Sequence, residues 1–310
     1  MAYQNSVTDG ADIDLRLWAY PPHSLLLTWP LGLIGYYAAL TVWSIIGLAV
    51  LFTGARRFGF DRLEIAIILT SPATILNVYL GQTGSFATGL MLLALSARTG
   101  RDPVSMAAAA LLTIKPQVGF LLPLLWTFQR RWRMIAWTAF VIAAFLAVAV
   151  ALFGLVPWRD YFGDTLPTLN ALERDGSGSF MTIIPSTFMA MRIVIGNSAS
   201  ALLIHVGFAA LVAAVLVLRL SQVEDANRRS AMVLIATALM TPYIHSYDLA
   251  LLLCGALLVA RRWSSPERRP PPGGELLVIV AWMLPHLVVL LNTIGLPISP
   301  LLILPLLFLA

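Results

Sequence analysis

The segment MIAWTAFVIAAFLAVAVALFGLV (residues 134–156) contains no charged side chain. At about 1.5 Å per residue, one helix of this length crosses the roughly 30 Å hydrocarbon core of a bilayer. Because lipid offers the backbone no hydrogen-bond partner, such a segment has to be helical. Similar apolar runs recur on both sides of it, at 24–54, 63–80, 84–97, 104–114, 117–128, 199–218, 231–243, 246–260, 275–291 and 300–310. The sequence therefore predicts an all-α, polytopic transmembrane helical bundle, with residues 1–310 as a single integral-membrane domain.

The composition supports this class and excludes others. Hydrophobic residues make up 59% of the chain and charged residues only 11%, with a mean hydropathy of +0.85. Soluble proteins carry about a quarter charged residues, so a water-soluble domain is excluded. A single cysteine, Cys254, cannot form a disulfide framework. The net charge of +5 comes from basic residues in short loops, so we expect no nucleic-acid partner.

Several of the apolar runs are too short to cross the bilayer alone. Such runs need a neighbouring helix or an internal cavity to complete the crossing. We therefore expect short, broken helices around a polar cavity inside the bundle.

The distribution of arginine predicts the orientation. Cytoplasmic loops of membrane proteins collect arginine and lysine. Arginines gather in five clusters, within 56–62, 98–101, 130–133, 219–229 and 261–269. These clusters alternate along the chain with segments that should then face outward, namely 20–22, 81–82, 115–116, 157–198 and 243–248. Most of the polar residues of interest lie in these segments, so we expect one cavity open to the outer side, lined by Tyr20, Gln82, Lys115 and His245.

The hydrophilic segment 157–198 interrupts the apolar pattern. It contains aromatic residues among its charges, including Trp158, Tyr161 and Phe162. This mixture is typical of a helix that lies on the membrane surface. A plain solvated connector would have a similar composition, so both interpretations stay open.

Lys115 is the single lysine of the chain, and it interrupts an apolar stretch. A cation at that depth is costly unless it meets water, a carboxylate or a phosphate, which makes it a functional candidate. Pro116 directly after it favours a break in the helix. The alternative is a lysine that reaches the interface from a helix end.

A second polar cluster lies at 241–248, between two short apolar runs. His245 and Asp248 are three residues apart and would share a helical face, so that the carboxylate could hold the imidazole. A purely structural polar network at a helix break would give the same pattern.

The string 77–84 (NVYLGQTG) ends one predicted helix and begins the next. Gly81 and Gly84 permit a tight turn, while Asn77 and Gln82 offer neutral donors and acceptors that suit sugar hydroxyls or phosphate oxygens. A simple turn between helices would look much the same.

Four strings, in this order, resemble glycosyltransferase family 87, and so the polyprenyl-phosphate-mannose-dependent mannosyltransferases of bacteria. They lie at 18–32 (with Tyr20-Pro-Pro), 77–84, 115–133 (Lys115-Pro-Gln followed by basic residues) and 242–248 (PYIHSYD). The resemblance extends over nearly the whole chain from about residue 18. It implies a GT-C fold in a bacterial plasma membrane, with the active site on the outer face.

The resemblance also implies a reaction. An inverting enzyme would move a hexose, mannose in this family, from a polyprenyl-phosphate sugar to a lipid or glycan acceptor, with no metal and no cofactor. Lys115 and Gln82 would contact the donor phosphate, and His245 with Asp248 would take part in catalysis. Asn77, Tyr20 and Tyr247 would contact the sugar or the acceptor. Because removing an unneeded buried charge does not destabilise a protein, we expect Lys115→Ala to abolish transfer with the fold intact.

One part of the family pattern is missing. The presumed base of the family is an aspartate in a first outer loop, after an opening membrane helix, and only a short acidic stretch precedes Pro21 here. We therefore expect the chain to be N-terminally incomplete, without that helix and loop, and to transfer sugar poorly or not at all. Within the chain, Asp9, Asp12 and Asp14 are the weak candidates for this base.

Two other functions remain open at this point. A secondary transporter or lipid flippase would also have broken helices and intramembrane charges, although no repeated half is visible. A non-catalytic membrane scaffold is the third alternative. A single pocket at one face would favour the enzyme, whereas a passage lined from both faces would favour transport.

Overall fold

The computed structural model describes residues 19–97, 101–263 and 269–310, and within these ranges every regular element is a helix. The prediction of an all-α protein is therefore confirmed. The helices are η1 (Pro22–Ser24), α2 (Leu25–Thr28), η2 (Trp29–Leu33), α3 (Tyr36–Phe58), α4 (Arg62–Leu69), α5 (Pro72–Leu80), α6 (Gly84–Leu95), α7 (Pro103–Leu111), η3 (Leu112–Ile114), α8 (Pro116–Gly119), α9 (Leu122–Phe128), α10 (Trp132–Phe153), α11 (Val156–Asp160), η4 (Tyr161–Thr165), α12 (Leu166–Asp175), α13 (Ser179–Thr182), α14 (Thr187–Ile195), α15 (Ser198–Gln222), α16 (Ala226–Met240), η5 (Ser246–Asp248), α17 (Ala250–Arg261), α18 (Gly274–Thr293) and α19 (Ser299–Leu309).

Four helices are long and apolar enough to cross a membrane, namely α3, α10, α15 and α18. A fifth crossing is formed if α4 and α5, which meet at a bend of 47°, act as one span. Five shorter apolar helical segments hold 11 to 13 residues each, namely Gly84–Leu95, Pro103–Ile114, Pro116–Phe128, Ala250–Arg261 and Ser299–Leu309. The expected combination of full spans with short, broken helices is thus confirmed.

Two apolar runs of the sequence are interrupted in ways that hydropathy does not reveal. The run 24–54 is split, because η1, α2 and η2 precede α3 and the extended residue Gly35 separates them from it. The run 63–80 bends after α4, where Ser71 accepts a hydrogen bond from the Thr74 backbone N–H and Pro72 begins α5. Proline has no N–H and is favoured in the first turn of a helix, so it marks such a start.

Two helices, α16 and α17, are enclosed by the rest of the bundle. Side chains are buried on all faces of both helices, from Ser230 to Leu239 and from Ala250 to Val259. The long spans instead expose most of their surface. In an 18-residue apolar stretch of each span, only 11% to 28% is buried inside the protein. A helix that is apolar on every face belongs in a core, so α16 and α17 are enclosed while the long spans face lipid.

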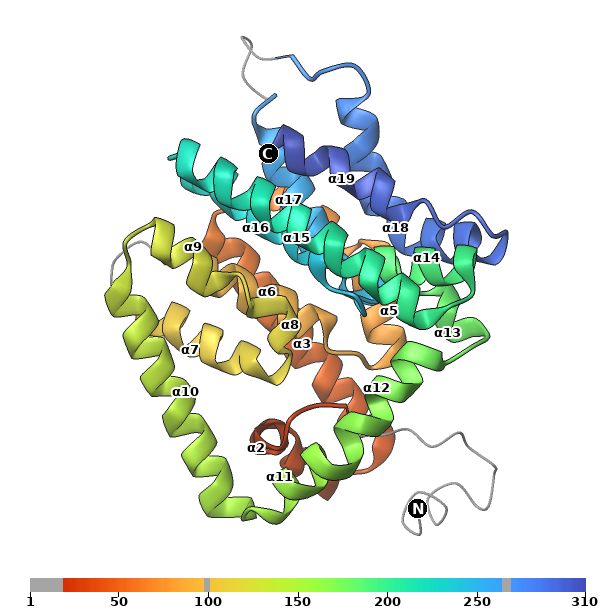
Figure 1. Cartoon of the computed structure of the whole chain (residues 1–310). Coiled ribbons are helices and arrows are strands. Elements are labelled where there is room, and N and C mark those ends of the chain that lie inside the picture. Colours follow the sequence, from red (N-terminus) through yellow and green to blue (C-terminus); the bar gives the residue numbers. More distant parts are fainter. Residues whose placement is uncertain (1–18, 98–100, 264–268) are drawn as a thin grey trace.

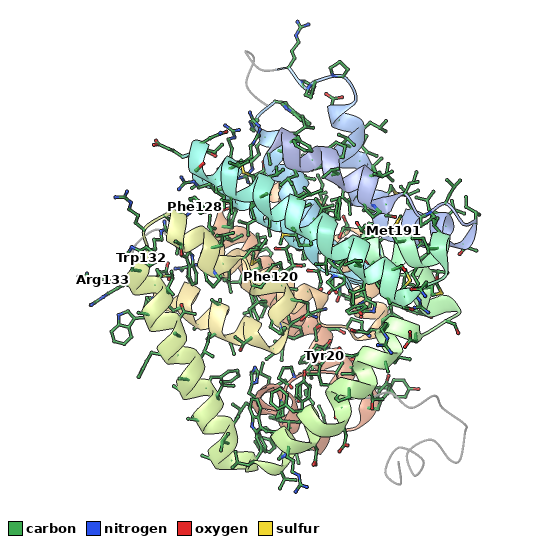
Figure 2. All side chains as sticks on the ribbon, in the orientation of Figure 1. Tyr20, Phe120, Phe128, Trp132, Arg133 and Met191 are labelled. Carbon is green, nitrogen blue, oxygen red and sulfur yellow. The ribbon has the colours of Figure 1, made fainter. Side chains whose placement is uncertain are left out.

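The arginine clusters meet at one end of the bundle, which we call the arginine end. Hydrogen bonds there connect the clusters with their neighbours and with the end of α19. They run from Arg57 to Ser96 and Asp102, from Arg131 to Ala97, from Arg261 to Gly59 and Glu64, from Arg219 to Phe308, from Arg228 to Ala310, and from Arg262 to Leu309. Figure 2 shows Arg133, at the start of α10, pointing away from the bundle.

Three core helices connect the arginine end with the opposite end. At the arginine end α6 stops before Ser96, α16 starts near Arg228, and α17 stops at Arg261. At the other end, Thr83, Thr241 and Asp248 flank these helices. The 12 residues of α6 span about 18 Å, less than the hydrocarbon thickness. This end of the bundle can therefore hold a recess below the level of the membrane surface.

The segment between α10 and α15 is helical and lies at the end of the bundle opposite the arginine end. In Figure 1, α11 and α12 run from the far end of α10 back toward α13. The interpretation of 157–198 as a plain connector is therefore wrong. Its helix α12 carries the wall of the cavity described next.

Candidate functional site

A cavity of about 290 Å³ opens at the end of the bundle opposite the arginine end. Its wall combines four regions of the chain that are far apart in sequence. The lining residues are Ala19, Tyr20 and Pro21; Ile114, Lys115, Pro116 and Gln117; Tyr161, Leu166, Leu169, Asn170 and Glu173; and Thr241, Pro242, Tyr243, His245 and Tyr247. The structure thus brings together Tyr20, Lys115, His245 and Tyr247, four of the residues that the sequence selected.

Lys115 reaches the cavity from the junction of η3 and α8. Its backbone cannot continue the helix, with φ −134° and ψ 70°, because Pro116 follows. The Lys115 Nζ lies 2.5 Å from the Asp248 Oδ1, and the two side chains are only 6% and 2% exposed. This is a buried ion pair between segments that are 133 residues apart.

The aromatic residues complete the surroundings of the ammonium group. Lys115 Nζ lies 5.4 Å from the centre of the Tyr247 ring, and 3.4 Å from the Thr83 hydroxyl. The Tyr20 hydroxyl lies 2.7 Å from the same Thr83 oxygen. The rings of His245 and Tyr247 stack at 4.9 Å between centres. Stacked and cation–π arrangements of this kind hold side chains in one orientation.

The expected side-chain pairing of His245 with Asp248 is replaced by another arrangement. The backbone N–H of His245 donates to Asp248 Oδ2 at 3.4 Å, whereas the other carboxylate oxygen accepts from Lys115. Asp248 ends a 3-10 turn, η5, and His245 precedes that turn in an extended conformation, with φ −98° and ψ 160°, so the two residues do not share a helical face.

Asn77 is buried away from the cavity wall. Its amide donates to the carbonyl oxygens of Ala73, at 2.9 Å, and of Tyr247. It therefore ties α5 to the η5 turn, which positions Tyr247. This contact favours the alternative interpretation, in which Asn77 belongs to a structural turn between two helices.

Gln82 also lies outside the set of residues that line the cavity. Its backbone N–H closes α5 by donating to the Asn77 carbonyl at 2.9 Å, and Gly81 takes the left-handed conformation at φ +62°. The expectation that Gln82 lines the same cavity as Lys115 is therefore wrong. The string 77–84 forms the turn between α5 and α6.

Glu173 was not selected from the sequence, yet it lines the cavity from α12. Burial raises the pKa of its carboxyl from 4.5 to about 7, and the nearby Lys115 ammonium opposes this rise. Leu166, Leu169, Asn170 and Glu173 repeat at the three- and four-residue spacing of one helical face. An acid on the apolar stripe of an amphipathic helix is the sequence signal that would have revealed it.

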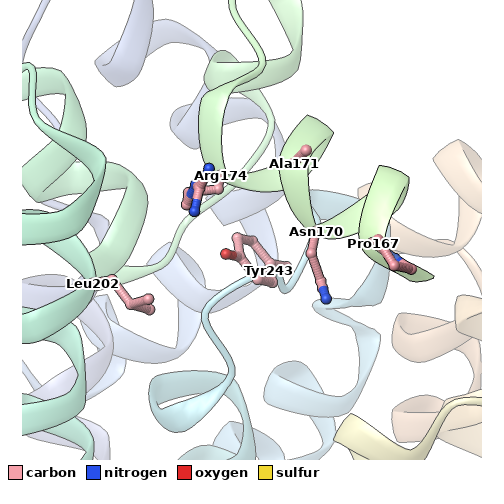
Figure 3. A pocket seen from close by; sticks show the side chains of 6 residues that line it. All are labelled: Pro167, Asn170, Ala171, Arg174, Leu202 and Tyr243. Atoms are coloured by element: carbon pink, nitrogen blue, oxygen red, sulfur yellow. The ribbon is translucent and has the colours of Figure 1, made fainter. Parts of the chain in front are cut away.

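A second cavity, of about 390 Å³, lies on the neighbouring face of α12. It is lined by Pro167, Asn170, Ala171 and Arg174 of α12, Leu202 of α15, and Tyr243. Figure 3 shows the Tyr243 side chain between Arg174 and Asn170. Asn170 and Tyr243 line both cavities, so the two cavities are neighbours that share part of their walls.

Asp9, Asp12 and Asp14 lie outside the described residues. Their assignment as weak candidates for the catalytic base therefore stays a prediction.

Comparison with known proteins adds the family. The model of glycosyltransferase family 87 matches residues 18–242. No curated protein and no solved structure matches the chain. The matched range includes Lys115 and Glu173 but ends before His245 and Asp248, so it is shorter than the resemblance in the sequence suggested. Because the match covers well over half of a chain with several membrane-crossing helices, the chain belongs to glycosyltransferase family 87 and is a membrane glycosyltransferase.

Proposed function

We propose that this protein transfers a hexose, mannose in the first instance, from a polyprenyl-phosphate sugar to a lipid or glycan acceptor with inversion at the anomeric carbon. The observation that carries the proposal is the buried Lys115 ammonium on the wall of the 290 Å³ cavity. A cation so placed meets the requirement of a reaction whose leaving group is a phosphate.

The hydrogen bonds of Lys115 leave room for a substrate. An ammonium group has three donors. One is directed to Asp248 and a second, longer contact is made with Thr83. The third donor is available to an oxygen of the donor phosphate, while Asp248 fixes the position of the nitrogen.

The remaining wall suits a sugar. Tyr20, Tyr247 and His245 present polar groups on flat apolar rings, and Gln117 and Asn170 add neutral amides. Sugars offer hydroxyls at their edges and apolar C–H groups on their faces, and such a wall can bind both. His245 stands beside the reacting centre in this proposal, with Asp248 acting through Lys115.

The membrane orientation in this proposal follows from charge. The arginine end carries the clusters that the positive-inside rule assigns to the cytoplasm, and the cavity lies at the opposite end. The protein would then work at the outer face of a bacterial plasma membrane. Family membership favours this enzyme over the transporter and scaffold alternatives.

The test is a transfer assay with the purified protein in lipid nanodiscs. The donors are short-chain polyprenyl-phosphate-mannose, polyprenyl-phosphate-glucose and, as the soluble control, a nucleotide sugar, with octyl mannoside and extracted bacterial lipids as acceptors. We expect release of polyprenyl phosphate and a product of inverted anomeric configuration from a lipid donor only. Transfer from the nucleotide sugar alone, or a product of retained configuration, would contradict the proposal.

A further inference from the structure

We infer that Glu173 and Asn170 of α12 bind hydroxyl groups of a hexose in the 290 Å³ cavity and thereby help to select the sugar that the site accepts. This inference rests on the proposed function. It gives Glu173 no part in proton transfer, and it leaves unchanged the prediction of a catalytic base in or ahead of the acidic stretch before Pro21.

The helix α12 presents the two polar side chains to the cavity together. Glu173 and Asn170 are three residues apart on this helix, so they lie on the same face. Leu166 and Leu169 line the cavity from α12 as well. The wall that α12 contributes therefore combines a carboxyl group and an amide with apolar surface. Such a combination suits a sugar ring, which has hydroxyls at its edge and C–H groups on its faces.

The carboxyl group of Glu173 is available to a ligand. Within residues 19–97, 101–263 and 269–310, it makes no hydrogen bond and no ion pair, and the same is true of the Asn170 amide. Asp248 differs, because its two carboxylate oxygens accept hydrogen bonds from Lys115 and from the His245 backbone. A half-buried carboxylate without donors is costly, and a bound molecule that supplies O–H groups removes this cost.

The surroundings of Glu173 favour neutral donors over a further cation. Among the described residues that line the cavity, Glu173 is the only one with a carboxyl group, and Lys115 already brings a positive charge to the same wall. Burial raises the pKa of Glu173 from 4.5 to about 7, and the Lys115 ammonium opposes this rise. Hydroxyl groups that donate to the carboxylate stabilise it without adding charge to the cavity.

Two tyrosines complete this part of the wall. Tyr161 of η4 and Tyr243 line the same cavity. Burial raises the pKa of both hydroxyls, and the charge of Glu173 raises it further, so the carboxyl group lies within electrostatic range of both phenols. Tyrosine offers a flat apolar ring beside a polar hydroxyl. A hexose that donates to Glu173 would therefore find ring surface and further hydrogen-bonding groups around it.

Hydrogen bonds of this kind discriminate between sugars. A site built to bind a hydroxyl rejects an analogue without it, because the polar group of the protein is then left unpaired. Hexose epimers differ in the direction of one hydroxyl, so an epimer changed at the contacted carbon would leave Glu173 or Asn170 without its donor. The pair would then act as a specificity determinant of the site.

The first test measures KM and kcat of the full chain in nanodiscs, separately for polyprenyl-phosphate-mannose and for octyl mannoside. Glu173→Gln keeps the shape of the side chain but accepts weaker hydrogen bonds, because the amide is uncharged. We expect its KM to rise by about 10-fold for the substrate whose hexose the residue contacts, donor or acceptor, with kcat nearly unchanged. Asp164→Asn, which alters an exposed acid that lines neither cavity, is the matched control and should behave as the wild type.

Deoxy sugars identify the contacted hydroxyl. Donor and acceptor analogues are each made without one of the hydroxyls that do not react. One analogue should have a KM about 10-fold higher than its parent with the wild type, whereas Glu173→Gln should barely distinguish the two. This non-additivity marks a direct contact, which a merely structural role of Glu173 would not produce. Asn170→Ala should lose discrimination at a neighbouring hydroxyl in the same way.

The outcomes separate this inference from the proposed function. Unchanged KM values for both substrates in Glu173→Gln, a fall in kcat alone, or additive effects with every deoxy analogue would overturn the inference and leave the proposed function standing. Titration calorimetry with the same sugars measures affinity without turnover. If the wild type turns over no lipid donor but Glu173→Gln still weakens sugar binding, only the proposed function is wrong. Absence of both turnover and sugar binding in the wild type would overturn both.

Discussion

Lys115 and Asp248 form an ion pair in which both side chains are almost fully buried. Removing one member of such a pair leaves an uncompensated charge and costs about 3–5 kcal/mol of stability, whereas replacing both by apolar residues is often neutral. The expectation that Lys115→Ala would leave the fold intact therefore has to be revised, because it treated the lysine as a lone cation.

We predict that Lys115→Ala lowers both the melting temperature and the transfer rate. The double variant Lys115→Met, Asp248→Leu should regain most of the stability but none of the activity, since the phosphate would still lack its cation. Thermal unfolding in detergent and the nanodisc transfer assay measure the two effects. A stable, active double variant would show that the pair serves folding alone.

Individual residues could be selected from the sequence, but their partners could not. Lys115 and His245 stood out because polar groups are costly in apolar stretches. The partner of Asp248, however, is 133 residues away, and no local pattern encodes a contact of that range. Glu173 was missed because it lies in a hydrophilic segment with several other acids, where the sequence gives no sign that a charged side chain is buried.

At the scale of the elements, the close approach of α6 and η5 sets the shape of the cavity. Gly84 begins α6, and a Cβ atom there would collide with the Tyr247 carbonyl oxygen and the Asn77 side chain. The same carbonyl accepts the hydrogen bond from Asn77. Only glycine lets the η5 turn, with Tyr247 and Asp248, lie this close to the helix.

We predict that Gly84→Ala destabilises the protein by about 1–3 kcal/mol, as expected for an added methyl group in a packed interface, and lowers transfer through displacement of η5. Gly207→Ala is the control, because a Cβ at this position in α15 meets nothing within 4 Å. Its melting temperature should stay the same or rise, since alanine favours a helix. A normal melting temperature for Gly84→Ala would contradict the packing argument.

The elements themselves were partly predictable. Hydropathy located the four long spans, because lipid exposure requires an unbroken apolar surface. It joined η1, α2, η2 and α3 into one run, since apolar side chains surround the break at Gly35 as well. Breaks of this kind depend on backbone conformation, which an average over side-chain polarity does not record.

For the whole molecule, the separation between the arginine end and the cavity predicts how the protein sits in a membrane. Hydrogen bonds gather the basic clusters at one end, and the core helices carry the cavity at the other. Under the positive-inside rule these ends lie on opposite sides of the bilayer.

This orientation can be measured with cysteine labelling in intact cells. The only natural cysteine, Cys254, is fully buried, so it should not react with the labelling reagent. We expect Asp164→Cys to react with a membrane-impermeant maleimide added outside, and Arg133→Cys to react only after the cells are opened. The reverse pattern would place the cavity in the cytoplasm and contradict the proposed outer-face reaction.

The position of α12 between two cavities has a consequence for ligand binding. Because α12 lines both cavities and Asn170 belongs to both walls, a displacement of this helix would change the shape of both cavities at once. Molecules bound in the two cavities would therefore influence each other through α12 without direct contact. The affinity of one cavity for its occupant would then depend on whether the other cavity is filled.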